Sequence, residues 1–344
     1  MLNNGDYTCR ITTPSGFLDG VVHIGEESMS IQTKSGANTG VREISYADIM
    51  DIRLINYHLF LHLLMDTVEL SWLGADTENF FEHVWSAVNK QAEKALFNDT
   101  AAERKFEADY AYNEVGGVKV NARGRAKIQL YPDCICVFPH DKGSRRIPFC
   151  FVKDVSEQGY ELTITLDTGD SYTIARMGQE TTPFLNKMHK FLNESRTGWQ
   201  QAHESLAANL KERLSARLIN YEILSSLPVK IVSGLFAPDS EEFYFAAIGK
   251  NRAAVELVIG ESSATYLYEF DCSGDDFEIS LRHAMEAVNK NREVIYADVE
   301  TLKEKPLYRM AISRSYHVSF LRQKMVGKII HNAGWEANIR DFLG

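Results

Sequence analysis

The chain has 344 residues, of which 44% are hydrophobic and 24% are charged, as in a folded globular protein of two or three domains. Its net charge of −10 disfavours nucleic acid as a partner and confines any binding of anionic lipid to a local patch, because phosphate groups are repelled. Five cysteines do not suit a disulfide framework, no apolar run could span a membrane, and no secretory signal is visible. We therefore expect a cytoplasmic protein.

Two stretches of the sequence, Gly20 to Asn89 and Gly124 to Asn193, match each other about one hundred and four positions apart. The matched pairs are Gly20 and Gly124, Ile24 and Ile128, Ile31 and Ile135, Phe80 and Phe184, and Asn89 and Asn193. In the middle the spacing shortens by one residue, as in the pairs Asp51 and Asp154, Tyr57 and Tyr160, and Leu59 and Leu162. A length change in a hairpin loop explains this shift, so the pattern predicts two domains of one fold.

Each repeat alternates apolar and polar residues in short runs and then changes to a helical spacing. In the second repeat, residues 126–130, 134–137, 162–166 and 172–174 alternate, which predicts half-buried strands. Thr182 and Pro183 then predict the start of a helix with one apolar face, formed by Phe184, Leu185, Met188, Phe191 and Leu192. The first repeat has the same plan and ends in Phe80, Phe81, Val84, Trp85 and Val88.

This order of elements resembles the pleckstrin-homology-like superfold, especially its GRAM-type members. The matching features are the strand Gly124 to Ile128, a basic hairpin, Ile147-Pro-Phe149, and Asp154-Val155 before two strands and a helix. The resemblance covers about half of the chain, in two copies, as in a bacterial-type protein with tandem domains. It implies an α+β fold class, with antiparallel barrel or sandwich units that are each closed by a C-terminal helix. Another small antiparallel barrel with a helix is the alternative.

The rest of the chain is predicted to be rich in helices. A linker helix is expected from Trp199 to Leu224, and two more helices are expected near Asp298 to Glu304 and Leu307 to His331. Three strand-like runs precede His283 to Lys290, which resembles His83 to Lys90, so a degenerate third repeat is one interpretation of this region. The expected domains are residues 1–98, residues 105–196, a linker helix at 199–226 and a C-terminal α+β region at 229–344.

No common motif of catalysis or nucleotide binding occurs in the sequence. His58 and His62 lie on a predicted strand, roughly 13 Å apart, which is too far for both to bind one ion. The group Cys134, Cys136, His140 and Cys150 lacks the spacing of structural zinc ligands, and small side chains on a sheet face are the simpler interpretation. We therefore expect no metal and no cofactor.

A basic cluster in the second repeat is the candidate ligand site. Its members are expected near one rim of the sheet: Lys119, Arg123, Arg125, Lys127, Lys142, Arg145 and Arg146. The resemblance implies that such cations bind phosphoinositide head groups. A solvated charged rim is the simpler alternative. The first repeat, with 5 basic and 12 acidic residues from Ser15 to Ala95, has no such cluster.

The segment from Lys303 to Asn332 contains seven basic residues and a single acidic one, with apolar residues interleaved. Such a helix is typical of docking to an acidic partner or to a membrane surface. An ordinary core helix of the C-terminal region with solvated charges is the alternative. We expect it to pack through its apolar side while its cations face acidic protein, in this chain or in a second copy. Its candidate partner-binding residues are Arg314, Tyr316, Phe320, Arg322, Lys324 and Lys328.

These features favour a non-catalytic binding or scaffold protein that uses pleckstrin-like domains to bind a protein partner or a second copy of itself. Binding of an anionic lipid or phosphate ligand through the basic cluster is one alternative. An enzyme with a site scattered over the C-terminal region is another.

Overall fold

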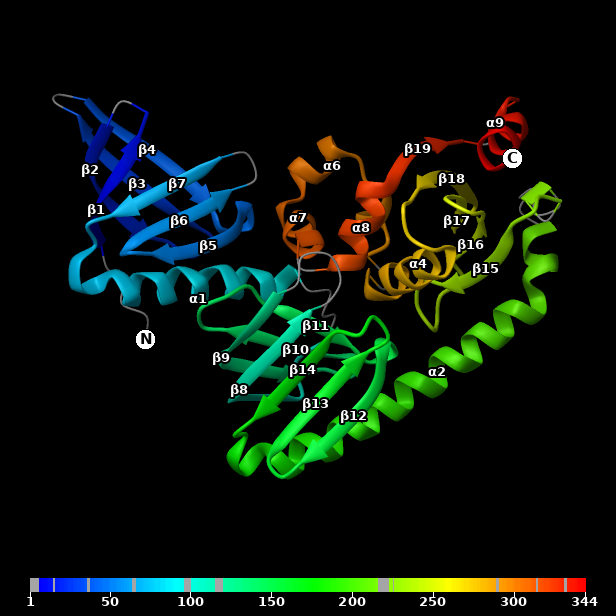
Figure 1. Cartoon of the computed structure of the whole chain (residues 1–344), viewed down its shortest axis with the longest axis horizontal. Coiled ribbons are helices and arrows are strands. Elements are labelled where there is room, and N and C mark those ends of the chain that lie inside the picture. Colours follow the sequence, from blue (N-terminus) through cyan, green and yellow to red (C-terminus); the bar gives the residue numbers. More distant parts are fainter. Residues whose placement is uncertain are drawn as a thin grey trace. The chain divides into compact units, whose positions relative to one another are not determined.

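The computed structural model describes residues 6–14, 16–35, 38–63, 66–95, 100–114, 120–215, 223–224, 226–288, 291–313, 315–330 and 333–344. The protein belongs to the α+β class, with three antiparallel sheets and several helices (Figure 1). It divides into two compact units. The first consists of Met1–Ile147, Lys153–Phe184 and Asp298–Arg314, and the second of Pro148–Val152, Leu185–Ala297 and Ser315–Gly344.

The first sheet has seven strands in the order β4-β3-β2-β1-β7-β6-β5. The strands are β1 (Asp6–Thr13), β2 (Gly16–Ile24), β3 (Ser28–Ser35), β4 (Asn38–Ser45), β5 (Ile49–Ile55), β6 (His58–Leu63) and β7 (Thr67–Ser71). A short 3-10 turn, η1 (Tyr46–Asp48), joins β4 to β5, and helix α1 (Thr77–Ala95) follows β7 after η2 (Gly74–Asp76). Alternate side chains such as Leu59 and Leu61 are fully buried, as the period-two pattern predicts.

The second sheet repeats this order as β11-β10-β9-β8-β14-β13-β12. Its strands are β8 (Arg104–Glu114), β9 (Val120–Leu130), β10 (Cys134–Pro139), β11 (Arg145–Pro148), β12 (Val152–Gln158), β13 (Glu161–Leu166) and β14 (Ser171–Ala175). The turns η3 (Phe149–Phe151) and η4 (Gly178–Glu180) occupy the places of η1 and η2, and helix α2 (Thr181–Ser215) follows. Trp72 and Arg176, just after the last strand of each sheet, both have a left-handed φ, of 60° and 54°. The internal repeat is therefore a repeat of topology.

The pairing of the strands corrects one part of the sequence match. Leu70 of β7 pairs with Ile11, and its equivalent Ile174 of β14 pairs with Tyr110. On their other sides, Ile11 faces Leu18 and Tyr110 faces Gly124. Leu18 is thus the equivalent of Gly124, and the match of Gly20 with Gly124 is two residues out of register. A shift of two residues keeps every side chain on the same face, so alternation could not reveal it.

Helix α1 bonds to both sheets of the first unit. The Gln91 amide donates to the backbone carbonyl of Glu26, in the β2–β3 hairpin, at 3.0 Å. Asn89 bonds to the β10–β11 hairpin of the second sheet: it donates to the carbonyls of Pro139 and Lys142, at 2.7 and 2.9 Å, and accepts from the backbone N–H of Ser144 at 3.0 Å. The helix that ends the first repeat therefore also fixes a hairpin of the second.

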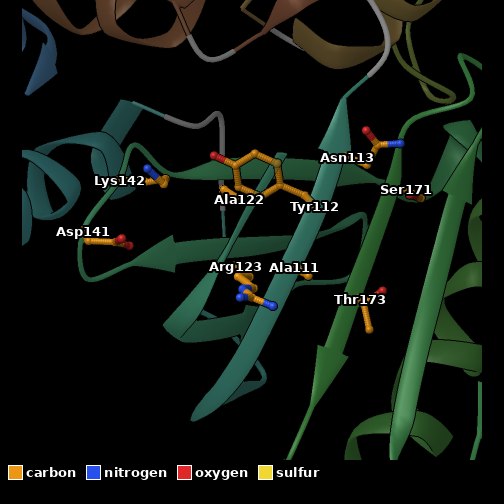
Figure 2. Close-up of a pocket in the computed structure, with 9 residues that line it drawn as sticks. All are labelled: Ala111, Tyr112, Asn113, Ala122, Arg123, Asp141, Lys142, Ser171 and Thr173. Atoms are coloured by element: carbon orange, nitrogen blue, oxygen red, sulfur yellow. The ribbon is translucent and has the colours of Figure 1, made fainter. Parts of the chain in front are cut away.

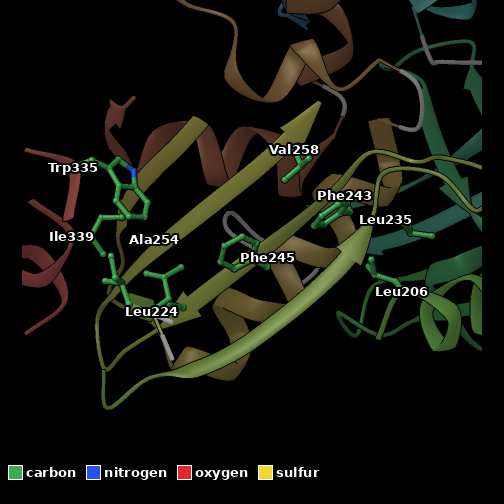
Figure 3. Close-up of a cluster of buried hydrophobic side chains, with 11 residues drawn as sticks. Leu206, Leu224, Leu235, Phe243, Phe245, Ala254, Val258, Trp335 and Ile339 are labelled. Atoms are coloured by element: carbon green, nitrogen blue, oxygen red, sulfur yellow. The ribbon is translucent and has the colours of Figure 1, made fainter. Parts of the chain in front are cut away.

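The second unit contains a five-stranded sheet in the order β15-β16-β17-β18-β19. The strands are β15 (Lys230–Leu235), β16 (Phe243–Ile248), β17 (Arg252–Ile259), β18 (Ser262–Glu269) and β19 (Met325–Ile329). Helices α4 (Gly274–Val288), α5 (Glu293–Tyr296), α8 (Tyr316–Lys324) and α9 (Trp335–Leu343) belong to the same unit. Figure 3 shows its core, in which Trp335 and Ile339 of α9 join Phe243 and Phe245 of β16.

Two expected helices differ in the structure. Helix α2 is continuous from Thr181 to Ser215, so the helix that starts near Pro183 and the expected linker helix form one element, and the part of that linker at 216–222 lies outside the described residues. The helix predicted from Leu307 to His331 is wrong, because this segment forms α7 (Pro306–Ser313), α8 and the strand β19. Val326, Gly327 and Ile329 disfavour a helix, and β19 instead pairs with β18.

The helix expected near Asp298 to Glu304 is confirmed as α6 (Val299–Glu304), with the Asp298 side chain accepting from the backbone N–H of Thr301. Within the part of the chain that the structure describes, no helix combines the length and the apolar character that crossing a bilayer requires.

Candidate functional site

The first unit contains a cleft of about 670 Å³ between β5, α1 and the β10–β11 hairpin. Six consecutive residues of β5, from Met50 to Ile55, line one side of it. The other sides are formed by Phe81 and Trp85 of α1, by residues 141–143 of the hairpin, and by Tyr112 and Arg145. A long stretch of one strand therefore borders a space that could hold another chain segment.

Strand β5 is an end strand of its sheet and carries exposed apolar side chains. In the described sheet it pairs with β6 alone. Met50 is 39% exposed and Ile55 is 51% exposed, and both line the cleft. Proteins usually protect such edges with charged residues, because an apolar end strand invites pairing with another chain.

The equivalent strand of the second sheet, β12, is protected in this way. At the spacing of the β5 and β12 bounds, Met50 corresponds to Lys153 and Ile55 corresponds to Gln158. Lys153 and Gln158 are exposed, as is Glu157. The two repeats thus share an end strand, but only in the first does it carry exposed apolar side chains, Met50 and Ile55, beside the exposed Arg53. This contrast marks β5 as the edge that is suited to a partner.

Trp85 places an unused hydrogen-bond donor at the wall of the cleft. Its side chain is 2% exposed, and its indole Nε1 has no acceptor within the described part of the chain. A buried donor without an acceptor costs about 1–3 kcal/mol of stability. The carbonyl of a bound segment is one group that could accept from this N–H.

Arg145 forms the most tightly bonded part of the cleft wall. Its guanidinium donates to both oxygens of Glu114, at 2.5 and 3.3 Å, and lies 4.9 Å from the centre of the Tyr112 ring. The Tyr172 hydroxyl donates to the same carboxylate at 3.1 Å. Burial raises the pKa of Tyr112 and of Tyr172, so both phenols stay neutral at physiological pH. Arg145 is therefore neutralised within the protein.

Two shallow depressions lie on the outer face of the second sheet. The first, of about 620 Å³, contains Arg123 of β9 between the hairpin residues Asp141 and Lys142 on one side and Ser171 and Thr173 of β14 on the other (Figure 2). The second, of about 660 Å³, extends toward Arg125, Arg176 and Tyr160. The three residues common to both depressions are Ala111, Arg123 and Thr173.

The structure brings only some of the basic cluster together. Arg123 and Lys142 line the same depression, and neither makes an ion pair within the described residues. The other cations have acidic partners: Arg125 lies 3.0 Å from Asp109, Lys127 3.7 Å from Glu93, Arg145 2.5 Å from Glu114 and Arg146 2.5 Å from Asp133. Lys119 lies outside the described residues.

The candidate partner-binding residues of the C-terminal segment make contacts inside the second unit. Arg322 donates to the carbonyls of Val294, Ile295 and Ala297, at 2.9, 3.2 and 2.6 Å. Lys324 donates to Asp271 at 2.7 Å and lies 5.8 Å from the centre of the Phe320 ring, and Lys328 lies 5.8 Å from that of Tyr266. Arg314 and the side chain of Tyr316 lie outside the described residues.

One cation of the same segment meets the acidic first repeat. Arg309 of α7 forms an ion pair with Asp48 of η1 and donates to the carbonyl of Leu302 at 2.8 Å. Helix α7 contacts both η1 and α1 in the first unit.

The potential metal ligands have other partners. His58 Nδ1 lies 2.6 Å from Glu69, and His62 Nδ1 lies 3.1 Å from the Thr67 hydroxyl. The Cys134 and Cys136 thiols are 3.9 Å apart in a buried cluster. In the described ranges of the chain, no three side chains of the ligating types gather around one point.

Comparison with known proteins adds no family to this geometry. A scan against models of protein families finds no match for the chain, and neither does a search of curated proteins.

Sequence reasoning missed the cleft, although a signal for it was present. The basic cluster drew attention to the second repeat, whereas the cleft is lined by β5 of the first. The spacing that matches Tyr57 with Tyr160 also matches Met50 with Lys153 and Ile55 with Gln158, so this difference between the repeats is visible in the sequence. An apolar residue at a matched exposed position is the signal that marks a surface kept for contact.

Proposed function

We propose that the chain is a non-catalytic binding protein built on two pleckstrin-like repeats, and that the first repeat binds an extended segment of a protein partner along β5. The identical strand order of the two seven-stranded sheets supports the pleckstrin-like assignment. The helix after each last strand supports it too, since the rings of Phe80 and Tyr7 lie 4.7 Å apart and those of Phe184 and Phe106 lie 5.1 Å apart. Each helix thus buries an aromatic side chain against the first strand of its own sheet.

The observation that carries the proposal is the end strand β5, whose exposed apolar side chains Met50 and Ile55 line a cleft. An added strand pairs its backbone with the free edge and places alternate side chains toward the wall. Six residues of β5 offer such a strand roughly 17 Å of edge. Met50 and Ile55 would lose exposed apolar surface on binding, which favours association by about 25 cal/mol for each Å² buried.

The test uses a displayed library of random peptides of about twelve residues, which span roughly 40 Å when extended. We expect the intact chain to enrich peptides that bind with micromolar affinity and that shift the amide resonances of β5. The variant M50K/I55Q gives β5 the residues that β12 carries at the matched positions. It should weaken binding more than about tenfold, because it removes the apolar contact and adds a charge.

The matched control is K153M/Q158I, which gives β12 the apolar side chains of β5. Lys153 and Gln158 lie outside the cleft lining, so the peptides should bind this variant as they bind the original chain. Failure to enrich any peptide, or equal affinity for M50K/I55Q and the original chain, would contradict the proposed function.

A further inference from the structure

We infer that the path of the bound peptide continues from the cleft across the outer face of the second sheet, and that the partner segment is acidic. This inference rests on the proposed function and names the chemistry of the partner. Its basis is the continuity of three hollows. The cleft and the first outer depression share Tyr112, Asp141 and Lys142, and the two outer depressions share Ala111, Arg123 and Thr173.

The side chains along this path favour negative charge. Six basic residues and four acidic residues line the three hollows together, in a chain whose net charge is −10. They are Arg53, Arg123, Arg125, Lys142, Arg145 and Arg176 against Asp51, Asp109, Asp141 and Glu161. Because Glu114 neutralises Arg145, five basic residues remain against the four acidic ones. The path is therefore slightly basic on an acidic protein, and electrostatic attraction favours an acidic segment there.

Two of these cations are available to a ligand. Arg145 is neutralised by Glu114, and Arg125 and Arg176 both bind Asp109, at 3.0 and 3.2 Å. Arg123 and Lys142 have no ion pair among the described residues. They come from different elements, β9 and the β10–β11 hairpin, as Figure 2 shows, so each can meet a separate carboxylate.

The floor of the path suits a peptide backbone. Ala111, Ser171 and Thr173 are small and leave the outer face of β8 and β14 shallow. The side-chain oxygen of Asn113, which lines the same depression, has no donor within the described part of the chain. A backbone N–H of an extended peptide can supply that donor. A compact phosphate would instead need cations that converge on one point.

The experiment measures the affinity of the enriched peptides for R123A, K142A and the double variant. The peptides should be rich in Asp and Glu toward one end. Each single variant should weaken binding about fivefold and the double variant about twenty-fivefold at low salt. Raising the salt concentration should weaken binding to the original chain and have little effect on the double variant.

The matched control is K127A. Lys127 lies on the same face of β9 as Arg123, is paired with Glu93 and lines none of the three hollows, so its loss removes one charge outside the path. The affinity of K127A should equal that of the original chain. Vesicles containing phosphatidylserine serve as a second probe, and the original chain should not retain them.

The outcomes separate this inference from the proposed function. If M50K/I55Q loses binding but R123A/K142A binds as tightly as the original chain, the cleft proposal stands and the acidic path is wrong. If no peptide is enriched, both are wrong. If the original chain retains the vesicles and R123A/K142A does not, the ligand of the path is a lipid head group and the inference of an acidic peptide is wrong.

Discussion

Arg10 and Asp109 occupy equivalent positions in the two seven-stranded sheets and carry opposite charges. Arg10 faces Asp19 across the β1–β2 pair, and Asp109 faces Arg125 across the β8–β9 pair, with the charged atoms 3.0 Å apart in both. The residue after the last strand adds a second contact to each. Trp72 stacks at 4.0 Å from the Arg10 guanidinium, and Arg176 lies 3.2 Å from Asp109. Both repeats thus keep an ion pair between these two strands, but the acidic and basic residues have exchanged strands.

Asp109 should matter more for stability than Asp19. It binds two guanidinium groups and its side chain is 29% exposed, whereas Asp19 binds one and is 81% exposed. We expect Asp109→Asn to lower the free energy of unfolding by about 1 kcal/mol and Asp19→Asn to leave it nearly unchanged. Chemical denaturation of both variants at low salt measures this difference. Equal effects of the two substitutions would contradict the assignment.

Asn89 should be among the most sensitive polar residues of the first unit. Asn89→Ala removes the two donated hydrogen bonds and the accepted one that hold the β10–β11 hairpin, and it leaves buried backbone groups without partners. We expect a loss of about 3 kcal/mol in the free energy of unfolding. The control is Asn193→Ala, at the matched position of the second repeat, where the side chain is exposed. Thermal unfolding that shows similar losses for both variants would refute this role.

The second unit should lose stability in mild acid through a buried pair of imidazoles. His283 Nδ1 lies 3.1 Å from His317 Nε2, and Phe151 packs 4.3 Å from the His283 ring centre. Burial lowers the pKa of both histidines below the ordinary value of 6.5, and the charge of Arg282 lowers that of His283 further. Below pH 6.5 the unfolded state therefore binds protons that the folded state does not, so stability is complete above this pH and falls as the pH drops.

Denaturation curves between pH 7.5 and roughly pH 5 measure this effect, because most carboxylates stay ionised over that range. Replacing His317 with Phe should make the decline shallower, while the contribution of His83, whose pKa burial also lowers, stays the same. An unchanged slope in that variant would show that the pair does not carry the effect.

Trp335 should anchor helix α9 to the third sheet. It is 2% exposed, and its indole donates at 2.8 Å to the hydroxyl of Thr265, which in turn donates to the buried Glu256. Trp335→Phe should cost about 1 kcal/mol for the lost hydrogen bond, and Trp335→Ala about 4 kcal/mol because it also opens a cavity. Hydrogen exchange of the β17 and β18 amides should rise in the same order. Equal protection in both variants would contradict this anchoring.

The sequence by itself determined several strands of the first two sheets and which of their side chains turn inward. Alternation predicted a strand at residues 162–166, where β13 lies, and Thr182 with Pro183 marked the start of α2 to within two residues. It also determined that the first two sheets share one order of strands, and the matched spacing is kept at the turns of Trp72 and Arg176. These features depend on neighbours a few residues apart, so a single chain records them.

Only the tertiary structure decided which groups meet. A period of two residues cannot distinguish Leu18 from Gly20 as the equivalent of Gly124, because both lie on the same face. Residues at matched positions of the two repeats also differ in their contacts: Asn89 bonds to a hairpin of the next sheet, whereas Asn193 is exposed. Of the basic cluster, Arg123 and Lys142 line one depression, whereas Arg125, Lys127, Arg145 and Arg146 are paired with acidic residues from other parts of the chain. Partner choice depends on the folding of distant segments against one another, and local pattern carries no record of it.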